Sequence, residues 1–214
     1  RVISKENGGH GSTINRGIQE ARGKYFKVVD GDDWVNTGDF VKLVKALKTC
    51  QGDYVATNYY EVNDKTGEKT SKDYKELSGK EVWKFEEAAA VTQLSMHSLV
   101  IKTEILKNNH IRLDEHCFYV DVEYILYPVP YVKTVQFLDL YVYMYRLAVT
   151  TQSVSLQGYQ KHMQNHIDVI LHLTEFFEKY AKSGSPEKTE YIGKRIAQMV
   201  GDQITIFVSF PETD

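Results

Sequence analysis

Three aspartates crowd into four positions immediately after an apolar run. Asp30, Asp32 and Asp33 follow residues 25–29 and precede Trp34. Carboxylates this close repel one another unless a cation lies among them. Hard divalent cations take carboxylate oxygens, and a phosphate-bearing ligand can complete their coordination. The pattern therefore predicts a metal-bridged phosphate site at the end of a strand.

Other aspartate patterns fit less well. A solvated turn with a helix cap would use the same residue types, but the apolar strand before them and the bulky Trp34 after them argue against it. An EF-hand loop needs Gly at position 35 and Glu at 41, where this chain has Val35 and Val41. A phosphatase of the haloacid dehalogenase type needs Thr or Val where Trp34 stands.

Four short segments resemble one family in their order and spacing. Residues 5–9 read Lys-Glu-Asn-Gly-Gly, residues 15–18 Asn-Arg-Gly-Ile, residues 21–25 Ala-Arg-Gly-Lys-Tyr, and residues 30–34 Asp-Gly-Asp-Asp-Trp. Together they resemble the middle of the catalytic domain of family 2 glycosyltransferases, and the resemblance extends to about residue 150. It implies a GT-A fold and inverting transfer of a sugar, with a uridine diphosphate sugar as the expected donor. The acceptor would be a hydroxyl group of a glycan or lipid-linked molecule.

The resemblance also implies roles for the aspartates. Asp30 would contact the donor ribose, Asp32 would bind Mg²⁺ or Mn²⁺, and Asp33 would support the donor site. A metal there stabilises the charge that develops on the leaving nucleoside diphosphate. The turn formed by Asn7, Gly8 and Gly9 would offer backbone N–H groups to the donor, helped by the helix that follows. This turn lacks the Walker lysine and the full dinucleotide fingerprint.

An inverting transferase also needs a base, which family members carry as an Asp, commonly after a Glu and before a helix. Asp121 stands in that place, with Val120 where the Glu is usual. The alternative for Asp121 is an ordinary carboxylate favoured by the helix dipole. On the acceptor side we name Glu61, His97 and His116, although such histidines are more often structural.

Two further patterns have structural interpretations. His162 and His166 are spaced like zinc ligands on a helix, but no acidic or cysteine partner completes a recognisable set. The tyrosine-rich run 141–146 alternates as a packed strand does.

The chain departs from the family in three respects. The family's first strand, helix and second strand would lie before Arg1, so we expect a chain that begins in mid-fold. Thr13 and Ile14 replace a common Ala-Arg, which leaves the expected arginine contact without a residue. The Gln-x-x-Arg-Trp motif of processive synthases is absent, which favours single additions.

The elements that position these residues follow from periodicity and turn signals. We expect an α/β fold with a mainly parallel sheet flanked by helices. Strands are predicted at 2–3, 24–29, 53–62, 98–101 and 133–146; helices from Ser12 to about 22, from Thr37 or Asp39, at 103–108 and at 121–127; a hairpin or loop at 63–80; and a C-terminal helical hairpin at 157–182 and 186–208. The predicted division is a catalytic domain at 1–150 and a helical extension at 151–214.

Composition and net charge limit the kinds of protein that this chain can be. The chain has 214 residues, of which 42% are hydrophobic and 26% charged, and its net charge of -3 gives no reason to expect nucleic acid. Two cysteines, Cys50 and Cys117, fit a reducing compartment. No apolar run reaches the roughly 18 residues that span a bilayer. We therefore expect a cytoplasmic protein, either free or peripheral to the inner face of the membrane, with a role in cell-envelope polysaccharide synthesis by family analogy.

A rival hypothesis is a catalytically incompetent, truncated GT-A module that acts in binding or assembly. Missing strands would leave sheet edges open to pairing, so a homodimer through an exposed edge is predicted. Phosphate-ester hydrolysis is the third alternative.

Overall fold

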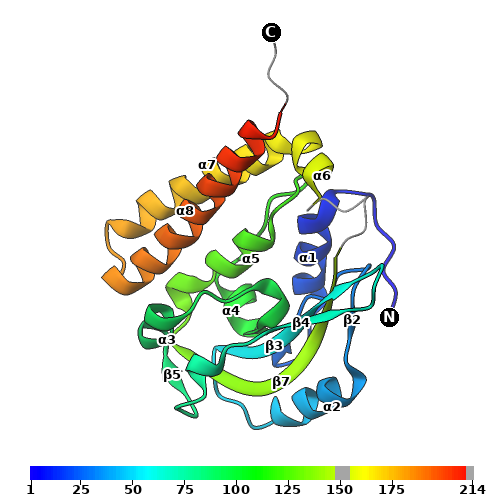
Figure 1. Ribbon diagram of the computed structural model, residues 1–214. Coiled ribbons are helices and arrows are strands. Elements are labelled where there is room, and N and C mark those ends of the chain that lie inside the picture. Colours follow the sequence, from blue (N-terminus) through cyan, green and yellow to red (C-terminus); the bar gives the residue numbers. More distant parts are fainter. Residues whose placement is uncertain (148–154, 211–214) are drawn as a thin grey trace.

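The computed structural model describes residues 1–147 and 155–210. Within them a curved mixed sheet carries helices on both faces (Figure 1). The strands are β1 (Tyr25–Phe26), β2 (Trp34–Val35), β3 (Tyr54–Asn63), β4 (Lys69–Lys72), β5 (Trp83–Lys84), β6 (Leu99–Lys102) and β7 (Thr134–Leu147). The α-helices are α1 (Gly9–Glu20), α2 (Thr37–Ala46), α3 (Phe85–Val91), α4 (Thr103–Asn108), α5 (Asp121–Leu126), α6 (Leu156–Lys161), α7 (Met163–Ala181) and α8 (Pro186–Val208). Short 3₁₀ turns lie at Lys75–Leu77, Met96–Ser98 and Val129–Tyr131.

The sheet has the order β1-β6-β3-β7-β2, with β4 added to β3 and β5 added to β7. Among the described strands only β3 and β7 pair in parallel; the other pairs are antiparallel. The prediction of a mainly parallel sheet is therefore wrong. An apolar run shows that a strand is buried but not which way it runs, because direction depends on the connection between strands.

Most element positions are confirmed, and a few are wrong. Residues 2–3 form no strand, and Val2 is almost fully exposed. Of the predicted strand 24–29 only Tyr25–Phe26 joins the sheet, through β6. The first helix begins at Gly9, with Gly8 as its N-cap, rather than at Ser12. The predicted helix 157–182 is divided at His162 into α6 and α7.

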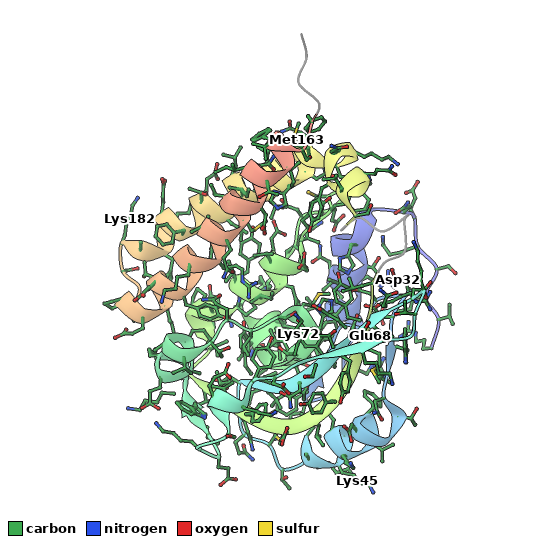
Figure 2. All side chains as sticks on the ribbon, viewed as in Figure 1. Asp32, Lys45, Glu68, Lys72, Met163 and Lys182 are labelled. Carbon is green, nitrogen blue, oxygen red and sulfur yellow. The ribbon has the colours of Figure 1, made fainter. Side chains whose placement is uncertain are left out.

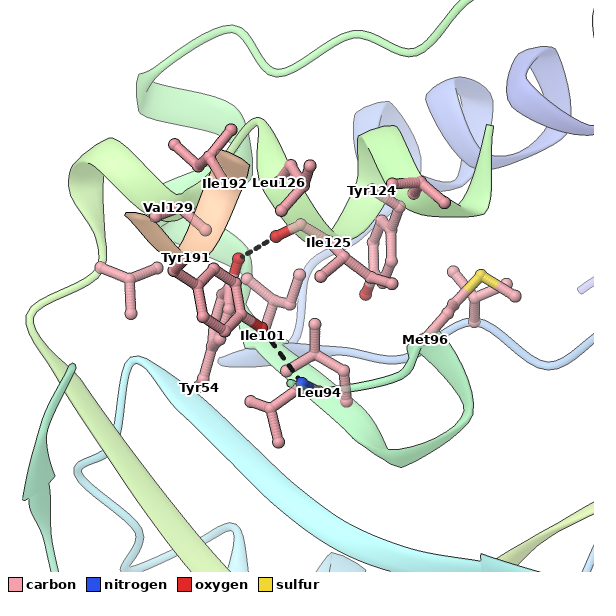
Figure 3. Close-up of a cluster of buried hydrophobic side chains, with 14 of the residues drawn as sticks. Tyr54, Leu94, Met96, Ile101, Tyr124, Ile125, Leu126, Val129, Tyr191 and Ile192 are labelled. Atoms are coloured by element: carbon pink, nitrogen blue, oxygen red, sulfur yellow. Dashed lines mark hydrogen bonds between the residues drawn. The ribbon is translucent and has the colours of Figure 1, made fainter. Parts of the chain in front are cut away.

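The C-terminal helices pack on the main core (Figure 3). Tyr191 of α8 is buried, and its hydroxyl accepts a hydrogen bond of 3.1 Å from the backbone N–H of Leu94. Beside it the hydroxyl of Tyr54 in β3 donates to the Ile125 carbonyl at 2.9 Å. The helical hairpin is thus confirmed, and it shares one hydrophobic cluster with the sheet. The predicted domain boundary near residue 150 lies outside the described residues.

Three apolar residues of α7 and α8 do not face the core. Leu171, Val200 and Ile204 are exposed, Ile204 by 57%. The core-facing side of α8 is instead formed by Tyr191, Ile192, Ile196, Met199, Gln203 and Ile206, together with Lys188.

On the opposite face of the sheet, α2 covers a smaller cluster (Figure 1). Leu43 packs there with Cys50, Val55, Val100 and Val142. Cys50 and Cys117 are both buried and form no disulfide. No helix in the described ranges is both long and apolar enough to cross a membrane.

Candidate functional site

The aspartate segment forms a turn between β1 and β2. The Asp33 N–H donates to the Asp30 carbonyl at 3.2 Å and closes the turn. Trp34 and Val35 then pair with β7, which attaches the segment to the long central strand. Figure 2 shows Asp32 on the side of the molecule opposite Lys182.

Tyr143 of β7 fixes two of the aspartates. Its hydroxyl donates to Asp33 Oδ2 at 2.6 Å and accepts from the Asp30 backbone N–H at 3.1 Å. The backbone N–H of Arg146 donates to Asp33 Oδ1 at 2.7 Å. The prediction that the tyrosine run is packed sheet is confirmed for the Tyr143 ring, which is fully buried. Its polar role was missed, because alternation does not show where a hydroxyl points.

Asp30 is also held by His10, whose Nε2 lies 2.9 Å from Asp30 Oδ1. Burial acts to lower the pKa of His10, but the hydrogen bond to Asp30 and the charges of Asp30, Asp121 and Asp32 raise it above its ordinary value. Burial acts to raise the pKa of Asp30, but His10 brings it below its ordinary value. His10 lies in the first turn of α1, just after the predicted Asn7–Gly9 turn, and its role was not foreseen from the sequence.

His97 reaches the same cluster from the 3₁₀ turn before β6. Its ring stacks on Tyr145 at 4.0 Å, and its Nδ1 lies 2.9 Å from the Ser95 hydroxyl. Burial lowers the pKa of His97 to about 4, so the imidazole is neutral at physiological pH. A neutral imidazole is a metal ligand.

Asp30, Asp33 and His97 each place a ligand atom within 4.8 Å of the other two. Burial raises the pKa of Asp33 to about 6, and the charges of Asp32 and Asp30 add to this. A divalent cation would relieve that crowding, and oxygen donors suit Mg²⁺ or Mn²⁺. Asp32, the predicted ligand, is exposed beside this set. The residues present therefore fit a hard cation.

Lys27 is a half-buried lysine that no sequence pattern pointed to. Its Nζ donates to the His97 carbonyl at 2.8 Å and lies 5.3 Å from the centre of the Tyr143 ring. Burial lowers the pKa of Lys27 to about 7, while the charge of Asp30 acts to raise it. The amine thus lies next to His97 and Tyr143, two residues that contact the aspartate cluster.

The glycine turn makes backbone contacts of its own. The Gly9 N–H donates to Asn7 Oδ1 at 3.0 Å, and the Gly8 carbonyl accepts from the His116 N–H at 2.6 Å. Gly9 has a φ of +79°, which favours glycine. The Gly9 N–H predicted for the donor is therefore already hydrogen-bonded within the chain. The side chain of His116 is exposed.

Asp121 is the first residue of α5 and borders a cavity of about 190 Å³. Burial raises the pKa of Asp121, while the charges of His10 and Arg195 act to lower it. Asp30 and Asp121 also act on each other electrostatically. Asp121 and the aspartate turn thus lie close enough for their charges to interact, and His10 interacts electrostatically with both.

A buried acidic group supports the segment before Asp121. Glu123 of α5 accepts the Asp114 N–H at 2.8 Å, and Asp114 pairs with His172 of α7. Burial raises the pKa of Glu123 to about 7. These contacts connect α5, the preceding loop and the C-terminal hairpin.

Glu61 lies further from this centre. Its carboxylate pairs with Lys72 of β4 at 3.2 Å, and its neighbour across the parallel ladder is Tyr145. Glu61 therefore lies on the strand next to the site, with an ion pair already formed.

The mixed sheet, the aspartate turn at its edge and Asp121 at the start of α5 are those of a GT-A fold. Residues 1–107 match the model of the family "Glycosyl transferase family 2". The chain belongs to glycosyltransferase family 2.

Sequence relatives agree with this membership, and a solved structure shares the fold. The chain is 43% identical over 60 residues to EpsJ of Bacillus subtilis, described as an uncharacterized glycosyltransferase, covering 28% of this chain and 17% of that protein. It is 30% identical over 141 residues to the glycosyltransferase GlyG of Streptococcus pneumoniae, covering 56% and 46%. The fold matches S. aureus TarS, solved with UDP-GlcNAc, with a TM-score of 0.54 and 16% identity over 97% of this chain and 55% of that one. This chain thus spans about half or less of the proteins it matches.

Proposed function

We propose that this chain forms the catalytic part of a metal-dependent, inverting glycosyltransferase. It would transfer a sugar from a uridine diphosphate donor to a hydroxyl group of a glycan or lipid-linked acceptor. The observation that carries the proposal is the shared setting of Asp30, Asp33 and Asp121. His10 of α1 hydrogen-bonds to Asp30, and the charge of Asp121 acts to raise the pKa of His10.

The donor would bind along the aspartate turn. Asp30, fixed by His10 and Tyr143, would face the ribose, and Asp33 and Asp32 would face the diphosphate. A bound Mg²⁺ or Mn²⁺ would supply Lewis-acid stabilisation of the diphosphate charge. Asp33 and His97, whose ligand atoms lie within 4.8 Å of each other, would hold it together with Asp32. The choice of donor is supported by TarS, whose structure holds UDP-GlcNAc.

Asp121 would act on the acceptor. Its carboxylate would take the proton from the acceptor hydroxyl as that oxygen attacks the anomeric carbon on the face opposite the leaving diphosphate. Burial, which raises the pKa of Asp121, makes the carboxylate a stronger base. The Asn7–Gly9 turn would also contact the donor. It would do so through backbone N–H groups other than that of Gly9, which already donates to Asn7 Oδ1.

Calorimetric titration of uridine diphosphate, with and without Mn²⁺, tests the donor site. We expect Mn²⁺-dependent binding that Asp32→Ala abolishes and that Glu178→Gln, an exposed change on α7, leaves intact. Asp121→Asn should keep this binding but lower sugar transfer by about 10²- to 10⁴-fold. Absence of binding by the unaltered chain would overturn the proposal and favour a binding or assembly module.

A further inference from the structure

The cavity beside Asp121 lies where α5 meets the C-terminal helices. In Figure 1, α6 and the nearby ends of α7 and α8 lie above α5. Tyr119 and Asp121, at the start of α5, border the cavity together with Tyr159 of α6 and Arg195 and Asp202 of α8. Asp121 therefore borders a partly open space formed in part by the helical extension.

Aromatic rings form one wall of this cavity. Tyr119 and Tyr159 are stacked with centroids 5.1 Å apart and an interplanar angle of 8°. His166 meets Tyr119 edge to face at 5.1 Å. The C–H face of a sugar ring packs against such flat, amphipathic surfaces.

The backbone at this wall is strained. Tyr119 has a φ of 67°, a left-handed conformation that costs a non-glycine residue energy. It lies two positions before Asp121. Strain of this kind persists where the surrounding structure enforces it, and it concentrates at ligand sites.

Arg195 is fixed at the border of the cavity. Its Nη2 donates to the Leu94 carbonyl at 2.6 Å, and its charge acts on Asp121. A guanidinium held in this way offers a fixed positive group beside the two carboxylates of the cavity.

The charges around the cavity are nearly balanced. Asp121 and Asp202 oppose Arg195, and burial lowers the pKa of His166, which also borders the space. No excess of positive charge is present among these residues to hold an anion. Mixed acidic, basic and amide groups, with Gln198 as the amide, suit an uncharged molecule with many hydroxyls.

The volume sets the size of the ligand. Its volume of about 190 Å³ is slightly above the ~150 Å³ of a protein cavity that binds one benzene ring. This space suits one sugar ring rather than an oligosaccharide.

We infer that this cavity is an acceptor subsite that binds one uncharged, terminal monosaccharide unit and presents its hydroxyl to Asp121. The inference rests on the proposed function and extends it. It assigns to Tyr119, Tyr159, Arg195 and Asp202 the recognition of the acceptor, and it makes the C-terminal helices part of the binding site.

Saturation-transfer NMR with methyl glycosides of glucose, galactose, N-acetylglucosamine and rhamnose tests the subsite. Glucuronic acid and glucose 6-phosphate serve as anionic counterparts. We expect at least one neutral glycoside to bind better than both anions. Asp202→Asn and Tyr159→Ala should weaken that binding about tenfold or more, while Tyr159→Phe, which keeps the ring, and Glu178→Gln should not.

Titration of uridine diphosphate with Mn²⁺ on the same samples separates the two proposals. Asp202→Asn should leave that binding unchanged, which also reports an intact fold. Donor binding without binding of any neutral glycoside would overturn the subsite alone, as would preference for the anions or indifference to Asp202→Asn and Tyr159→Ala. Loss of donor binding in the unaltered chain would overturn the proposed function, and with it the acceptor role.

Discussion

At the scale of single residues, Asp33 is held where ionisation is costly. Burial raises its pKa from 3.8 to about 6. A carboxyl whose pKa is raised by folding stabilises the protein below its unfolded pKa, and this contribution is lost as pH rises through the folded value. We therefore expect stability to fall between pH 4 and 7, by about 1–2 kcal/mol from Asp33 after solvent screening.

Thermal unfolding of the unaltered chain and of Asp33→Asn across that range tests this prediction. The difference in melting temperature should favour the variant increasingly as pH rises. Glu178→Gln should follow the unaltered chain. A constant difference between the two curves would show that Asp33 ionises without penalty.

The hydroxyl of Tyr143 orients both Asp30 and Asp33. Tyr143→Phe keeps the buried ring but removes the group that donates to Asp33 and accepts from Asp30. We expect affinity for uridine diphosphate with Mn²⁺ to fall about tenfold and stability to fall by about 1–2 kcal/mol. Tyr145→Phe, on the same face of β7 with its ring on His97, is the matched control. Equal affinities in the two variants would remove Tyr143 from the site.

At the scale of elements, local signals predicted most of the fold but not its connections. The β3 and β7 segments and the helix 103–108 follow from apolar runs and turn residues, and the structure confirms them. Strand direction and the close packing of α1 on the loop before Asp121 depend on contacts distant in sequence. For the same reason His10, Tyr143 and Arg195 were missed, since each acts through a partner on another element.

Gly11 allows α1 to approach that loop closely. A Cβ at this position would lie 2.0 Å from the Asp114 carbonyl oxygen. Gly11→Ala must therefore displace backbone, and we expect a loss of about 2 kcal/mol or more. Gly201→Ala in α8 is the control, because its Cβ meets nothing within 4 Å and should stabilise by up to about 1 kcal/mol. Denaturant unfolding measures both, and equal stabilities would contradict the close approach.

At the scale of the whole molecule, the helical hairpin and the sheet share one core, so we expect them to unfold together. Leu173 of α7 and Tyr191 of α8 are buried in the same cluster as Tyr54 of β3. Leu173→Ala should cost about 2–5 kcal/mol, and Tyr191→Phe, which leaves the Leu94 N–H without its acceptor, about 1–3 kcal/mol.

Far-ultraviolet circular dichroism reports the helices, and hydrogen exchange at Val55 and Val100 reports the sheet. Both probes should shift by the same amount in each variant, because a two-state domain has one transition. Val142→Ala, in the cluster that α2 covers on the other face of the sheet, is the matched test. It should shift the unfolding transition by the same amount in both probes. Helices that melt before the sheet would show that the C-terminal hairpin is a separate unit. In that case the acceptor subsite at their junction would form only while the two remain docked.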